Sequence, residues 1–144
     1  MTGRATARLK SLCNGAVAVC VAALFAAPSS AEQRVVLEIR AGAEVLEIPT
    51  DRIAEAEAFL DASNLPAVRL RFDDRAGREF ATFTERHVGE VLRFSLCGRV
   101  LVEPVLRTPI YGGTGVIASS DPDMAAAVAD ILNRRGGCER MPDR

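Results

Sequence analysis

The 144-residue sequence has no tryptophan, one tyrosine (Tyr111), one histidine (His87) and a single lysine, Lys10. One histidine and few cysteines provide too few ligands for a zinc site, so neither a metal nor a cofactor is expected. A phosphate-binding loop at the glycine-rich stretch 112–115 is disfavoured, because no lysine is near and a strand follows the glycines. The sequence around His87 carries no nucleophile motif, so no catalytic residue is assigned.

The sequence also lacks an apolar run long enough to span a membrane. Its longest run, Gly15 to Ala27, has 13 residues, and a spanning helix needs about 20. Basic residues precede this run, and the small residues Ser29-Ser30-Ala31 follow it. The pattern predicts a secretory signal peptide over residues 1–31 with cleavage after Ala31. An uncleaved membrane anchor is the alternative.

Acidic and basic residues are nearly balanced, at 19 and 18. Loss of residues 1–31 would remove three basic residues and no acidic ones, so the net charge would fall from −1 to −4. A mildly acidic domain is a poor candidate for binding nucleic acid or an anionic membrane surface. The remaining length suits one domain with one modest core.

Two cysteines, Cys97 and Cys138, follow the predicted signal peptide. An even pair in an oxidising compartment predicts a disulfide. Closing a loop of roughly 42 residues would stabilise the fold by about 4 kcal/mol, less any strain. The alternative is that the two cysteines are a redox-active pair, but the sequence lacks the Cys-x-x-Cys motif typical of such pairs.

Apolar periodicity predicts the elements of the fold. Residues 51–62 are predicted to form a helix, with Thr50 as its N-cap and apolar residues on one face. Two further helices are expected, one from Asp73 or Asp74 to Gly89 and one from Pro122 to Gly136-Gly137. Strands are expected at 35–39, 45–48, 68–72, 92–96 and 100–102, and after Pro109.

The order of these elements is β-β-α-β-α-β-β-β-α. It predicts an α+β domain over residues 32–138, with an antiparallel or mixed sheet and helices packed on one face. Residues 139–144 are expected to be a flexible tail. Arginines 69, 71 and 93 could form a row that binds carboxylates of a partner, although a solvated face partly neutralised by Glu38 and Glu90 is the more common case.

Three ordered segments give the chain a resemblance to a known family. They are PAVRLRFDDRAGREFATFT (66–84), VGEVLRFSLCGRVLVEPVL (88–106) and PIYGGTGVI (109–117), followed by a helix with an alanine run. From about residue 50 to 132 the chain resembles the head subdomain of the first periplasmic domain of SecD and SecDF, accessory membrane proteins of the Sec protein-export machinery. Two departures are Cys97, where the family commonly has aspartate, and Ser119, where a glycine often follows the return strand.

The resemblance implies an α+β head domain and a capacity to contact unfolded or exported polypeptide or a Sec translocon component. The predicted signal peptide implies a periplasmic location. The resemblance does not imply an export motor, because full SecD-type proteins carry several transmembrane helices. The expected contact surface is the loop before the return strand, where prolines and glycines bound apolar residues. Its candidate residues are Leu106, Ile110, Tyr111, Gly112 and Gly113.

The sequence thus predicts a non-enzymatic, protein-binding periplasmic domain without stable membrane insertion after signal cleavage. Two alternatives remain. One is a small periplasmic hydrolase using His87, which would need an acidic residue or hydroxyl brought against the imidazole by the fold. The other is a structural domain with no ligand.

Overall fold

The computed structural model describes residues 34–143. The predicted signal peptide and its cleavage position lie outside the described residues.

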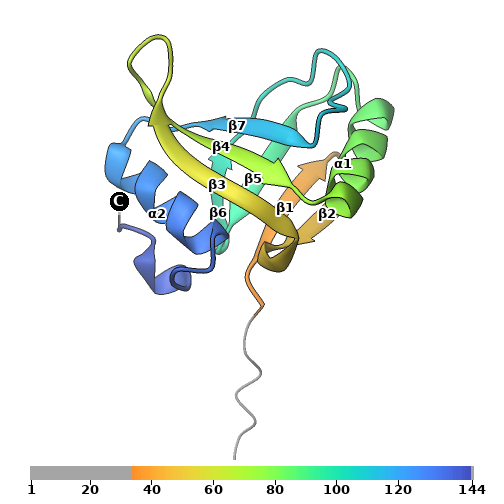
Figure 1. Ribbon diagram of the computed structural model, residues 1–144. Coiled ribbons are helices and arrows are strands. Elements are labelled where there is room, and N and C mark those ends of the chain that lie inside the picture. The colour runs from red at the N-terminus through yellow and green to blue at the C-terminus, as the bar shows by residue number, and fades with distance from the viewer. Residues whose placement is uncertain (1–33, 144) are drawn as a thin grey trace, which may run out of the picture. The chain divides into compact units, whose positions relative to one another are not determined.

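Seven strands form two antiparallel sheets (Figure 1). The four-stranded sheet has the order β2-β1-β5-β6, and the three-stranded sheet has the order β3-β4-β7. The first comprises β1 (Val36–Ala41), β2 (Glu44–Pro49), β5 (Leu92–Leu96) and β6 (Arg99–Val102). The second comprises β3 (Ile53–Leu60), β4 (Pro66–Phe72) and β7 (Thr114–Ala118).

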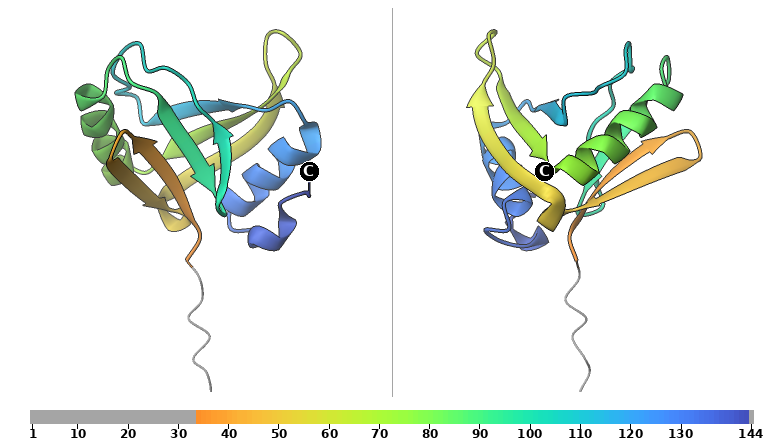
Figure 2. Two further views of the ribbon diagram at one scale, coloured as in Figure 1. Left: turned by 180° about the vertical axis from the view of Figure 1, so that it is seen from behind. Right: turned by 45° about the vertical axis from the view of Figure 1, so that its right-hand side comes forward.

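Two helices, α1 (Asp74–Arg86) and α2 (Pro122–Leu132), lie at opposite ends of the sheets (Figures 1 and 2). Short 3-10 helices occur at η1 (Thr50–Arg52) and η2 (Cys138–Arg140). Both helices begin where predicted, because Asp73 accepts a hydrogen bond from the amide of Ala76 at 2.7 Å and Asp121 caps α2. The predicted α+β class is confirmed.

The core lies between the two sheets and is closed by the helices. Phe80 of α1 is fully buried and joins the sheets, because its ring centroid lies 5.1 Å from that of Phe72 on β4 and 6.4 Å from that of Phe94 on β5. At the other end of β4, Val128 of α2 lines a pocket together with Val68. Both helices therefore cover the same face of the three-stranded sheet.

The helix predicted over residues 51–62 is wrong, because this segment is η1 followed by strand β3. A register shift between Ile53 and Glu55 marks a β-bulge in its pairing with β4. The extra residue turns both Ile53 and Ala56 toward the core, three positions apart. A bulge therefore produced the spacing of a helix face within a strand.

The C-terminal end of the chain also differs from expectation. Helix α2 was predicted to end at Gly136-Gly137, but its last residue is Leu132, Asn133 is its C-cap and Arg134 takes a left-handed conformation (φ 61°). In the predicted tail, Glu139 and Arg140 belong to η2 and Met141 packs against the core. Arg99 of β6 also donates a hydrogen bond to the carbonyl of Pro142.

Candidate functional site

The crossover, residues 103–113, joins β6 to β7 and contains the predicted contact residues. Thr84 of α1 fixes its path. The Thr84 hydroxyl accepts a hydrogen bond from the amide of Ile110 at 3.0 Å and donates one to the carbonyl of Ala81 at 2.9 Å. Because Thr84 is fully buried, water does not compete for these bonds.

A contact between two glycines fixes the end of the crossover. A Cβ added to Gly77 of α1 would lie 3.3 Å from the Cα of Gly113, which leaves little space for a side chain. Gly113 has φ 61°, and its carbonyl accepts a hydrogen bond from the amide of Phe72 at 2.8 Å. Gly113 therefore sets the backbone geometry where the crossover enters β7.

The predicted contact residues occupy different environments. Tyr111 is 67% exposed, Gly112 is exposed and Ile110 is half-buried. Leu106 is 6% exposed and belongs to the core, so its assignment to the contact surface is wrong. Its backbone explains the difference, because Leu106 donates to the carbonyl of Glu90 and accepts from the amide of Gly89, both at 2.8 Å.

The exposed phenol of Tyr111 faces α1. Partial loss of hydration raises the pKa of Tyr111. The negative charge of Glu85 and a hydrogen bond to its carboxylate raise this pKa further. A phenol, whose ordinary pKa is near 10, is protonated at physiological pH and can donate hydrogen bonds.

Two pockets flank strand β7. One, of about 290 Å³, lies between β7 and the crossover and is lined by Val105, Ile110, Gly115 and core side chains including Phe80. The other, of about 380 Å³, lies among β6, β7 and α2. Ile117 lines both pockets.

His87 lies at the end of α1 and is 7% exposed. Its Nε2 is 3.2 Å from Glu44 of β2, and its Nδ1 is 3.3 Å from Glu90 without the alignment of a hydrogen bond. Its ring centroid lies 4.5 Å from that of Phe83. The fold thus brings carboxylates to His87, as a hydrolase would require, but Glu44 links the β1–β2 hairpin to the end of α1 and Glu90 lies in the turn that follows α1.

A hydroxyl one turn earlier in α1 does not complete a catalytic arrangement. Thr84 is fully buried, and its hydroxyl is engaged by Ala81 and Ile110. It therefore cannot act as a nucleophile on a substrate. Within residues 34–143, no group of three or more His, Cys, Asp or Glu residues is arranged to hold a metal ion.

The arginine row is neutralised by carboxylates other than those expected. Arg69 and Arg71 lie on the outer face of the three-stranded sheet, each paired across to β3, with Glu57 at 2.9 Å and Glu55 at 3.1 Å. Arg93 lies on the other sheet and pairs with Glu103 at 2.7 Å. The exposed pairs satisfy these guanidinium groups and favour a solvated face.

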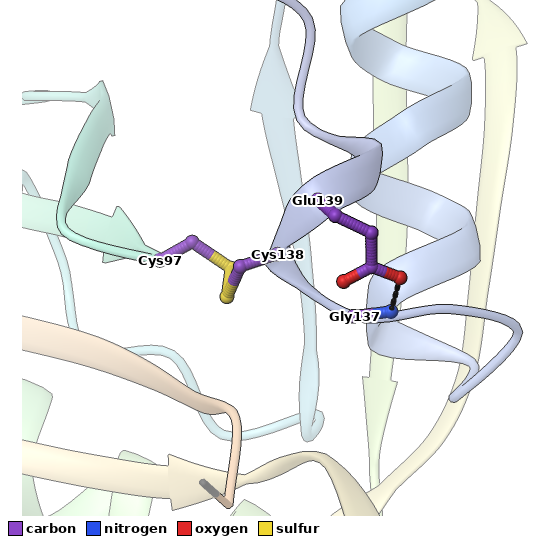
Figure 3. The surroundings of a disulfide bond; sticks show 4 residues. All are labelled: Cys97, Gly137, Cys138 and Glu139. Carbon is purple, nitrogen blue, oxygen red and sulfur yellow. Dashed lines mark hydrogen bonds between the residues drawn. A yellow bond between two sulfur atoms is a disulfide. The ribbon is translucent and has the colours of Figure 1, made fainter.

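Cys97 and Cys138 form a disulfide in the structure (Figure 3). Cys97 and Gly98 both have positive φ, 54° and 74°, as a tight two-residue hairpin turn requires. Beside Cys138, the carboxylate of Glu139 accepts a hydrogen bond from the amide of Gly137 at 2.8 Å (Figure 3). That bond lowers the pKa of Glu139.

These features define an α+β domain with a hydrogen-bonded crossover and two pockets beside β7. No helix within the described part of the chain is both long and apolar enough to cross a membrane. Residues 25–136 match the family model described as "SecDF, P1 head subdomain", and the chain belongs to this family.

Curated relatives agree with the family model. The chain is 34% identical over 93 residues to protein translocase subunit SecD of Rhodobacter capsulatus, covering 65% of this chain and 17% of that protein. It is 35% identical over 91 residues to protein translocase subunit SecDF of Thermus thermophilus, covering 62% of this chain and 12% of that protein. The chain therefore spans less than a fifth of the length of these relatives.

Solved structures agree with the fold. A structure of SecDF, reported as a membrane component that enhances protein export, matches with a TM-score of 0.61 at 25% identity, covering 70% of this chain and 63% of that one. SecDF in a super-membrane-facing form matches with a TM-score of 0.56 at 32% identity, covering 60% of this chain and 12% of that one.

Proposed function

We propose that this domain is a non-enzymatic, protein-binding module of the periplasm that contacts exported polypeptide or a component of the Sec translocon. Its membership of the SecDF P1 head family supports a place in protein export. The relatives are translocase subunits several times its length, so the head supplies binding rather than the activity of the whole subunit. The predicted signal peptide supports the location.

The observation that carries this proposal is the crossover. Thr84 and Gly77 hold its backbone against α1, while Tyr111 stays 67% exposed at its end. A rigid loop that presents an aromatic side chain loses little conformational entropy when a partner binds. Tyrosine also combines apolar area with a hydrogen-bonding group, which suits a protein interface.

Photocrosslinking in cells from a probe at Tyr111, with adducts identified by mass spectrometry, tests the proposal. We expect adducts with many exported proteins or with Sec subunits. A control probe at Arg69 lies on the outer face of the three-stranded sheet and should give few adducts. Adducts from the Arg69 probe alone would show that the contact surface is the outer face of the sheet and not the crossover. An absence of adducts from both probes would contradict the proposal.

Tyr111→Asp should weaken binding to the crosslinked partner by about tenfold, because it removes exposed apolar area from an interface. Its melting temperature should change little, since Tyr111 is mostly exposed. Leu65→Asp is the matched control, because Leu65 is 55% exposed in the β3–β4 turn. Equal loss of binding and stability in Tyr111→Asp would instead make Tyr111 a structural residue.

A further inference from the structure

Strand β7 pairs with only one neighbour, β4. Hydrogen bonds from Phe72 to the carbonyl of Gly113 and from Ser119 to the carbonyl of Pro66 bracket this pairing, so odd-numbered residues of β7 bond to β4. In an antiparallel ladder the intervening residues direct their N–H and C=O groups away from the partner. The amides and carbonyls of Thr114, Val116 and Ala118 thus face outward along what we call the β7 edge.

The opposite edge of the same sheet is covered. On β3, the amide of Ala56 donates to Oδ1 of Asn133 at 3.0 Å, and its carbonyl accepts from Nδ2 of Asn133 at 2.6 Å. The side-chain amide of Asn133 thus occupies the place of a neighbouring strand. Within residues 34–143, no hydrogen bond covers the β7 edge in this way.

The composition of β7 does not protect its edge either. Its sequence, Thr-Gly-Val-Ile-Ala, has no charged residue and no proline. Proteins usually protect exposed strand edges with lysine, proline, a bulge or a covering segment. An unprotected edge of this kind favours pairing with another extended chain.

The two pockets beside β7 lie where such a chain would place its side chains. Ile117 faces the core, and Gly115 shares its face of the sheet and lines the 290 Å³ pocket. A Cβ added to Gly115 would meet no heavy atom within 4 Å, so the pocket is open at this position. The 380 Å³ pocket is lined by Ile117 together with residues of β6 and α2. Glycine within a strand often marks a place where a ligand or a second backbone approaches closely.

We propose that an extended segment of unfolded polypeptide pairs with the β7 edge, adding a strand to the three-stranded sheet and placing alternate side chains in the two pockets, an apolar one in the 290 Å³ pocket. An extended backbone is the occupant because it supplies alternating donors and acceptors that match those of Thr114, Val116 and Ala118. Backbone pairing is independent of sequence. The 290 Å³ pocket is lined mostly by apolar side chains and favours an apolar residue, whereas the 380 Å³ pocket also has Arg99, Ser119 and Asp121 in its lining. This inference rests on the proposed function and specifies the surface and the form of the bound chain.

The first test is residue-resolved amide hydrogen exchange by NMR on the full chain. The probe is carboxymethylated α-lactalbumin, a permanently unfolded polypeptide. We expect the amides of Thr114, Val116 and Ala118 to exchange at least about tenfold more slowly when it is bound, because new ladder bonds protect them. The amides of Gly115 and Ile117 already bond to β4 and should change little.

Two substitutions test the edge and the pocket separately. Val116→Pro removes an outward amide and should weaken binding about tenfold, whereas Val116→Thr keeps the amide and should bind like the native protein. Gly115→Leu should fill the pocket and weaken binding to a similar degree. Its melting temperature should not fall, because the side chain enters open space and glycine entropy is removed from the unfolded chain.

The outcomes separate this inference from the function on which it rests. If the polypeptide binds but protects only the amides of residues 110–113, the β7 edge is not the binding site, and the proposed function still stands. No binding of the unfolded polypeptide would overturn this inference, whereas crosslinks from Tyr111 to Sec subunits would still support the proposed function. Protection of the β7 edge that depends on protein concentration and needs no polypeptide would identify a second copy of this chain as the occupant, against the proposal.

Discussion

The effect of Glu85 on the pKa of Tyr111 can be followed by ultraviolet absorbance, because the chain has one tyrosine and no tryptophan to add to the signal. The raised pKa of Tyr111 means that the folded state holds the phenolic proton more tightly than the unfolded chain, whose phenol titrates near pH 10. The contribution of this group to stability is therefore complete below about pH 10 and is lost as pH rises through the higher folded pKa.

Glu85→Gln should lower the pKa of Tyr111 toward its ordinary value, because it removes a nearby negative charge. Titration of tyrosinate by its ultraviolet absorbance measures this directly. Glu79→Gln is the control on the same helix, since Glu79 pairs with Arg75 at 3.0 Å, and it should leave the titration unchanged. An unshifted titration in Glu85→Gln would show that hydration alone sets the pKa.

At the scale of elements, the sequence predicts those whose signals are local. The caps Asp73 and Asp121 satisfy backbone amides within three residues of themselves, so α1 and α2 begin where expected. The prediction for β3 was wrong because the spacing of its buried residues depends on a bulge in its pairing with β4. That pairing joins two segments and cannot be seen in β3 alone. The alternation of Glu55 and Glu57 was a usable strand signal, since both pair with arginines on β4.

Asn133→Ala should destabilise the domain by about 1–3 kcal/mol, because it leaves the amide and carbonyl of Ala56 without partners. Urea unfolding followed by circular dichroism measures the change. Asn133→Asp keeps an acceptor for the amide of Ala56 and loses the donor to its carbonyl, so a smaller loss is expected. A fully stable Asn133→Ala variant would mean that water replaces the side chain at this edge.

For the whole molecule, the sequence located the crossover but not its surroundings. Prolines and glycines indicated that the crossover is a loop, and Tyr111 is exposed there. The burial of Leu106 depends on backbone pairing with Gly89 and Glu90, and the β7 edge depends on which strand pairs with which. Neither follows from periodicity, because both depend on contacts between distant segments.

Replacing both Cys97 and Cys138 by serine should lower the free energy of unfolding by about 4 kcal/mol, since the bond restricts the unfolded chain. The urea midpoint measures this loss. A reductant should lower the midpoint of the native protein to that of the variant and leave the variant unchanged. A native midpoint that does not respond to reductant would contradict a stabilising disulfide in the folded protein.

The same bond has a mechanical consequence. Residues 97 and 138 close a covalent ring that contains β6, the crossover, β7 and α2. Tension applied to β7 is therefore carried from both of its ends, through the backbone and one S–S bond, to the β5–β6 turn. The ring limits how far β7 can be drawn from the sheet, even while its hydrogen bonds to β4 break and re-form. Reduction would remove this limit and leave β7 restrained only by non-covalent contacts.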